Sequence, residues 1–202
     1  MSFAIIAPIV EGHGEMPAVR VLLPRIAAEY SGTAVQVEQP FRLDSAKMRK
    51  SEELAKAIRV QSARVRGHGG VLVLRDGDDK DKKCPVELAK EMAPAPGVVN
   101  VAVEIVIARH EYEAWFLAAA ESLRTHSAVR DDAEAPEDPE VRRDAKGALR
   151  AIMNEPYRET LHQARFSAAM DLRLAERRSR SFRRLIHAVQ ILVGAPTGRR
   201  ER

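Results

Sequence analysis

Hydrophobic runs alternate with helix-forming segments along the first part of the chain. Four runs are short, apolar or alternating, and rich in β-branched residues, which is typical of strands in a sheet. These runs cover 3–10, 33–39, 70–76 and 98–108. The helical segments cover 17–30, 45–66, 84–93 and 111–124. This strand–helix alternation predicts an α/β fold in which helices flank a parallel four-stranded sheet.

The pattern changes after Thr125. Residues 131–140, with the sequence DDAEAPEDPE, are acidic and hold two prolines, so they predict a loop or a partly disordered linker. Helical patterns then cover 141–153, 159–178 and 180–193. We therefore expect an α/β domain over 1–125, and an acidic linker with a helical extension packed on that domain over 126–202.

Composition indicates the cellular compartment of the protein more clearly than its function. The chain has 202 residues and a net charge of +4, which mildly favours an anionic partner. Its single cysteine, Cys84, excludes an internal disulfide and fits a reducing compartment. No segment has the length of a membrane span, and the start lacks a basic leader. We expect a cytoplasmic protein that does not enter the membrane, and assembly into a homo-oligomer is left open.

Acidic side chains follow two of the predicted strands directly. The segment EGHGE brings Glu11 and Glu15 after the first strand, and RDGDD brings Asp76 and Asp78 at the end of the third. Ligands of parallel α/β sheets collect at the carboxyl ends of strands. Two aspartates two positions apart on an extended backbone project to one side of the chain. Oxygen ligands of this kind predict a site for Mg²⁺ or Mn²⁺.

Each acid also has a simpler interpretation. Asp-Gly is a common turn pair, and the lysines of DDKDKK can neutralise the aspartates in open solvent. Glu15 suits the first turn of a helix, where a carboxylate interacts favourably with the helix dipole. His13 lies in the same turn, either exposed or in contact with a phosphate.

The segments IVEGHGE and LRDGDDKD together resemble the Toprim domain of topoisomerases, bacterial primases, recombination mediators and OLD-type nucleases. The signature of that domain is a glutamate in a glycine-containing turn and a later Asp-x-Asp. Glu11 matches the first part, and Asp76 with Asp78 matches the second. The EGxxE form, which adds Glu15, is closer to the OLD-type nucleases. The resemblance covers about the first 120 residues and implies a Toprim-like, Rossmann-like sheet.

Two further segments are similar to a narrower set of Toprim-like bacterial proteins of unknown function. These segments are EYEAWFLA (111–118) and SRSFRRL (179–185). That likeness implies a role in defence against phage, often alongside an ATPase partner. Trp115, Phe116 and Leu117 have helical spacing that predicts core positions.

The Toprim resemblance implies roles by position. Glu11 would serve as a metal ligand or general acid–base, and Asp76 and Asp78 as metal ligands. Glu15 would add a ligand in a nuclease-like site. A second metal about 4 Å from the first would use the acids after the fourth strand. The candidates for that second metal are Glu111 and Glu113.

The basic residue that OLD-type nucleases place late in the domain has no clear counterpart here. The candidates are Arg109, His110, Arg178 and Arg180. The basic segment RLAERRSRSFRRLIH also offers a surface for phosphates, on which we expect Arg178, Arg180 and Arg183 to bind nucleic acid together with His13. A solvated helix face explains the same charges.

Three functions are therefore compared. The first is a Mg²⁺- or Mn²⁺-dependent phosphodiester hydrolase, a nuclease acting on DNA or RNA, for which the narrower resemblance implies an ATPase partner. The second is a non-catalytic or regulatory Toprim module that binds nucleic acid or a protein partner. The third is a nucleotide-sugar transferase, which also uses a strand-end Asp-x-Asp, although that reading leaves the EGHGE turn without a role.

Overall fold

The strands form one parallel sheet. The structure, a computed structural model, describes residues 3–77, 84–141 and 143–194. Its strands are β1 (Ala4–Val10), β2 (Val35–Val37), β3 (Phe41–Arg42), β4 (Gly69–Asp76) and β5 (Ala102–Ala108). The four predicted strands are confirmed, and the two-residue strand β3, which was not predicted, makes this a five-stranded sheet. So short a strand leaves no periodicity in the sequence.

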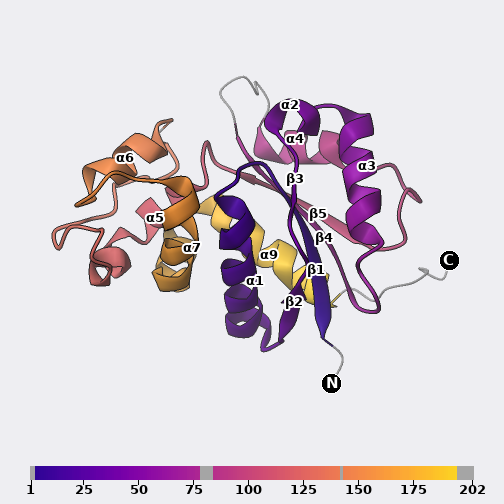
Figure 1. The fold of residues 1–202 in the computed structure, drawn as a ribbon, viewed down its shortest axis with the longest axis horizontal. Helices are drawn as coiled ribbons and strands as arrows, with labels where there is room; N and C mark the ends of the chain where they lie inside the picture. Colours follow the sequence, from indigo (N-terminus) through magenta and orange to yellow (C-terminus); the bar gives the residue numbers. More distant parts are fainter. Residues whose placement is uncertain (1–2, 78–83, 142, 195–202) are drawn as a thin grey trace.

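Helices fill the connections and most of the carboxyl-terminal part (Figure 1). They are α1 (Glu15–Ser31), α2 (Ser45–Met48), α3 (Ser51–Ser62), α4 (Pro85–Met92), α5 (Glu113–Ala118), the 3₁₀ helix η1 (Ala120–Thr125), α6 (Ala145–Ala151), α7 (Glu159–Ala169), α8 (Leu172–Arg178) and α9 (Arg180–Gly194). The helix predicted over 159–178 is interrupted because Asp171 caps α8, accepting hydrogen bonds from the backbone N–H groups of Arg173 and Leu174. The helix predicted over 45–66 is likewise two helices, α2 and α3.

The order in which strands are added to the sheet reverses between β1 and β4, which makes this pair the topological switch point. The sheet runs β2-β1-β4-β5, with β3 also pairing with β1. The chain thus leaves β1 toward one edge, returns to β4, and then continues to β5 at the other edge. Because all of these pairs are parallel, the strands end at the same edge of the sheet. The ends of β1 and β4 therefore flank the position where α/β sheets usually bind ligands.

Different helices pack on the two faces of the sheet. Side chains of β4 alternate, so that Leu72 and Leu74 belong to the core beneath α1 and α9, and Val71 and Val73 to the core beneath α3. The C-terminal helix α9 therefore packs on the sheet beside α1. Figure 1 shows α5, α6 and α7 grouped on one side of the sheet and α3 on the other.

The acidic segment 131–140 contains no helix or strand, and its last residue has a structural role. Glu140 is buried and accepts hydrogen bonds from the backbone N–H groups of Arg180 and Ser181 at the start of α9, both over 2.8 Å. The indole N–H of Trp115 donates to the Ser181 hydroxyl over 2.8 Å. The segments EYEAWFLA and SRSFRRL are thus in direct contact. Trp115, Phe116 and Leu117 are core residues, as predicted.

No helix within the described ranges is long and apolar enough to cross a membrane.

Candidate metal-binding site

The carboxyl ends of β1 and β4 bring the first two predicted acids together. Val10 lies opposite Leu74 in the register of the two strands, so Glu11 emerges beside Arg75 and Asp76. Oε2 of Glu11 lies 4.0 Å from Nε of the buried Arg75. Burial raises the pKa of Glu11, while Arg75 and a hydrogen bond from the Asp76 backbone act in the opposite direction.

Glu15 closes the turn between β1 and α1. Its Oε2 accepts a hydrogen bond from the backbone N–H of Glu11 over 2.9 Å, and the residue is 3% exposed. Burial raises the pKa of Glu15 to about 7, and the nearby carboxylates of Glu11 and Glu113 add to the increase. Glu15 therefore has the structural role of a helix-start acid and still contributes to the charge of the site.

Asp76 lies on the face of the sheet that α1 and α9 cover, because it alternates in phase with Leu72 and Leu74. Its Oδ1 accepts a hydrogen bond from the backbone N–H of Tyr112 over 2.9 Å. Burial raises the pKa of Asp76 well above its usual value, and three other carboxylates raise it further. Those carboxylates belong to Glu15, Glu113 and Glu11. We refer to these four residues as the carboxylate cluster.

Glu113, the first residue of α5, is fully buried. Its Oε1 accepts two hydrogen bonds, from the Tyr157 hydroxyl over 2.7 Å and from Nε2 of Gln163 over 2.9 Å. Its Oε2 has no hydrogen-bond partner among the described residues. Burial raises the pKa of Glu113 although Lys146, Tyr157 and Gln163 all lower it. One oxygen of a buried carboxyl group is thus left unsatisfied beside other carboxylates.

Glu111 faces a different partner. Its Oε2 accepts a hydrogen bond from the backbone N–H of Lys146 over 2.8 Å, at the start of α6. Its Oε1 lies 3.9 Å from Nζ of the same lysine. Of the two acids predicted for a second metal, the structure brings Glu113 into the carboxylate cluster and engages Glu111 with α6.

Lys146 is a cation of this site that the sequence did not indicate. Its Nζ lies 2.9 Å from Oε1 of Glu159. Burial lowers the pKa of Lys146, but the carboxylates of Glu113, Glu159 and Asp76 outweigh that effect and raise it above its usual value. Lys146 lies in a helical stretch without a recognisable motif, so nothing in the sequence linked it to acids that precede it by more than thirty positions.

The arrangement of the acids does not form a complete cage of metal ligands among the described residues. Within 3–77, 84–141 and 143–194, no three His, Cys, Asp or Glu side chains are arranged to hold a metal ion. Mg²⁺ commonly binds through one or two carboxylates and keeps several water molecules, so it does not require a three-residue cage. Asp78, the predicted partner of Asp76, lies outside the described residues.

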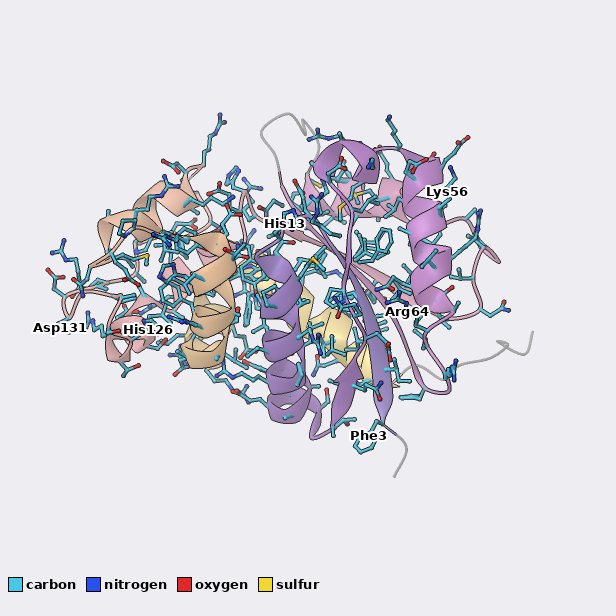
Figure 2. The ribbon with its side chains drawn as sticks, in the orientation of Figure 1. Phe3, His13, Lys56, Arg64, His126 and Asp131 are labelled. Carbon is cyan, nitrogen blue, oxygen red and sulfur yellow. The ribbon has the colours of Figure 1, made fainter. Side chains whose placement is uncertain are left out.

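The predicted phosphate-binding residues are on the surface. His13 is exposed in the turn before α1 (Figure 2), and Arg178, Arg180 and Arg183 are exposed on α8 and α9. Arg178 pairs with Glu121 over 2.7 Å. Arg183 donates to the backbone oxygen of Glu176 over 2.7 Å. Two of these arginines therefore also hold parts of the fold together.

The remaining basic candidates follow β5. Arg109 is exposed, and His110 has a positive φ of 63°, a conformation that histidine adopts more readily than most residues. The turn at His110 directs the chain from β5 toward α5, and so toward Glu113.

Fold and site together define an α/β protein with a Rossmann-like parallel sheet and buried carboxylates at its topological switch point. The chain belongs to the family described as a domain of unknown function, DUF4276, whose family model matches residues 10–190. That match begins at the last residue of β1, covers the other four strands, and ends within α9. No curated protein and no solved structure matches the chain significantly.

Proposed function

We propose that the protein is a Mg²⁺-dependent phosphodiester hydrolase that acts on nucleic acid. The observation that carries this proposal is the unsatisfied Oε2 of Glu113, which is fully buried and belongs to the carboxylate cluster. A group of this kind costs free energy in the protein alone, and a bound cation would remove that cost.

The electrostatics support a cation specifically. Glu15, Asp76 and Glu113 all have raised pKa values because burial and, for Glu15 and Asp76, neighbouring carboxylates disfavour ionisation. Lys146 is the cation that most directly opposes this effect at Glu113. A divalent ion would bring two further positive charges to the same place, and would hold the carboxyl groups in their ionised form.

The position of the site supports phosphate chemistry. Mg²⁺ at a strand end usually keeps water ligands that a substrate phosphate displaces. Asp76 and Glu113 would hold the ion, which would lower the pKa of a bound water and polarise the phosphate. Lys146 would neutralise charge on the phosphate oxygens, and the Tyr112 amide keeps Asp76 in place. The choice of a phosphodiester as the substrate rests on the resemblance of the EGHGE and RDGD segments to Toprim nucleases. The same resemblance implies Asp78 as a further metal ligand.

A second candidate function is a non-catalytic module that binds nucleic acid or a protein partner. The observation that favours it is Lys146, whose ammonium group already lies near Glu111 and Glu159 and acts on Asp76 and Glu113. In this reading the lysine is the permanent counter-ion of the carboxylates, and the protein needs no metal.

The test is a cleavage assay on purified protein. Plasmid, linear duplex DNA, single-stranded DNA and RNA are incubated with Mg²⁺, with Mn²⁺ or with EDTA. The variants Asp76→Asn and Glu113→Gln remove charge at the site with little change in shape. Asp132→Asn is the matched control, because Asp132 is an exposed acid paired with Arg130 over 2.6 Å on the surface.

We expect wild type and Asp132→Asn to cleave at least one substrate only with metal, and the two site variants to lose at least about 100-fold in rate. Cleavage that persists in both site variants would mean that another site or a contaminant is responsible. Binding without cleavage of any of the four substrates would favour the non-catalytic function.

A further inference from the structure

Two side chains from the helical extension act on one oxygen of Glu113. Tyr157 precedes α7 and Gln163 lies within it, whereas Glu113 begins α5 at the end of β5. Both donors bond to Oε1, over 2.7 and 2.9 Å. Both are buried, so water does not substitute for either of them easily. The two oxygens of Glu113 are thereby made unequal: Oε1 accepts two hydrogen bonds and Oε2 accepts none from the described residues.

From this asymmetry we propose that Tyr157 and Gln163 are positioning residues that fix Glu113 so that Oε2 is its cation-binding atom. The inference rests on the proposed metal site and adds that the helical extension completes it. Partners of this kind orient a metal-binding carboxylate and fix which of its oxygens faces the ion.

Tyr157 is itself held in place by its neighbours. Its ring stacks on His162, with ring centroids 5.6 Å apart. His162 is fully buried, accepts a hydrogen bond from the backbone N–H of Arg158, and contacts Glu155 over 2.9 Å. The segment that carries Tyr157 is therefore tied to α7, and the hydroxyl meets Glu113 without the cost of ordering a mobile side chain.

Gln163 is held by the approach of α7 to the EGHGE turn. Gly14 in that turn faces α7, and a Cβ atom placed there would lie 2.8 Å from the backbone oxygen of Glu159 and would overlap the Gln163 side chain. The missing side chain at position 14 thus allows α7 to come close enough for Gln163 to reach Glu113. The turn that carries Glu11 and Glu15 and the helix that orients Glu113 are in direct contact.

A purely structural role for the two hydrogen bonds makes a different prediction. If Tyr157 and Gln163 only stabilise a buried carboxylate, removing them lowers the melting temperature and leaves cation affinity unchanged. If they position Oε2, cation affinity falls in protein that is still folded. The measurement must therefore report binding directly, without relying on cleavage.

The experiment titrates the 202-residue chain with Mn²⁺ and follows the free ion by electron paramagnetic resonance. The variants are Tyr157→Phe, which removes only the hydroxyl, Gln163→Leu, and the double variant. Tyr30→Phe is the matched control, because the Tyr30 hydroxyl also donates to a carboxylate, Oε2 of Glu176, over 2.9 Å. Circular dichroism confirms that each variant is folded, and Gln163→Leu carries the test alone if the Tyr157 variants do not fold.

We expect wild type and Tyr30→Phe to bind Mn²⁺ equally well, and the double variant to bind about 10- to 100-fold more weakly. Equal Mn²⁺ affinity in folded double variant and wild type would overturn the inference while leaving the proposed hydrolase intact. Weakened Mn²⁺ binding, together with no cleavage by wild type, would support the inference and reject the hydrolase. Failure of wild type to bind Mn²⁺ would overturn both.

Discussion

The backbone N–H of Tyr112 donates a hydrogen bond to Oδ1 of Asp76 over 2.9 Å. This bond joins the turn after β5 to the end of β4, and Glu113 is the next residue along the chain. The carboxylates of Asp76 and Glu113 repel each other. They are nevertheless held near each other through the main chain, because Asp76 cannot move away from Glu113 without losing its hydrogen bond to the Tyr112 amide. The fold maintains an unfavourable arrangement of charge, as functional sites often do.

The first prediction is that removing the charge of Asp76 stabilises the protein without metal. Asn in its place keeps an oxygen for the Tyr112 amide and removes the repulsion from three carboxylates. Near neutral pH in EDTA, we expect Asp76→Asn to gain about 1 kcal/mol or more, which is about 2–4 °C in melting temperature. Thermal unfolding measures the change. Asp132→Asn should show no gain, and a lower melting temperature for Asp76→Asn would mean that the charge is favourably paired.

The second prediction concerns pH. The pKa of Glu15 is raised from 4.5 to about 7 in the folded protein. Between these values the native state binds more protons than the unfolded state, so the free energy of unfolding falls as pH rises through that window. We expect the melting temperature of metal-free protein to decrease from pH 4.5 to about 7. Glu15→Gln keeps an acceptor for the Glu11 amide and should make the decrease smaller. A decrease of the same size in Glu15→Gln would show that another group causes it.

The third prediction tests the contact between the EGHGE turn and α7. Gly14→Ala places a Cβ atom 2.8 Å from the Glu159 backbone, so α7 must shift. We expect a loss of about 1–3 kcal/mol in the free energy of unfolding, measured by denaturant titration. Gly194→Ala is the control, since a Cβ atom there would meet no atom within 4 Å among the described residues. Unchanged stability of Gly14→Ala would mean that α7 does not pack as closely as described.

The fourth prediction tests whether Lys146 and a bound metal ion both act as counter-ions of the carboxylate cluster. Lys146→Met keeps the apolar stem and removes the charge near Asp76 and Glu113. Without metal near neutral pH, we expect Lys146→Met to lose about 1–2 kcal/mol in the free energy of unfolding relative to wild type. We also expect saturating Mg²⁺ to raise its melting temperature more than that of wild type. Lys56→Met is the control, because Lys56 pairs with Glu53 over 2.9 Å on the surface. Identical responses to Mg²⁺ in Lys146→Met and wild type would contradict a shared electrostatic site.

The sequence predicted the sheet because buried strands leave a strong local signal. The apolar runs at 3–10 and 70–76 correspond closely to β1 and β4, and Glu11 and Asp76 meet at one edge because the two strands are parallel. Strand β3 was not predicted, because two residues leave no periodicity in the sequence. The break at Asp171 was also missed, although an aspartate that caps a helix start is a local signal.

The partners of the site could not be predicted from the sequence. Tyr157 and Gln163 follow Glu113 by 44 and 50 positions, and no local pattern indicates that they meet it. Sequence position also did not separate Glu111 from Glu113, although one faces α6 and the other the carboxylate cluster. Side chains two positions apart differ here because α5 begins between them.

The most direct measurement is anomalous diffraction from crystals soaked in Mn²⁺. We predict an anomalous peak for a Mn²⁺ ion that is bound by the Asp76 carboxylate and by Oε2 of Glu113, at about 2.0–2.2 Å from each of these oxygen ligands. Occupation of that position by the Lys146 ammonium group, with no anomalous peak at the carboxylate cluster in fully soaked crystals, would contradict the proposed metal site.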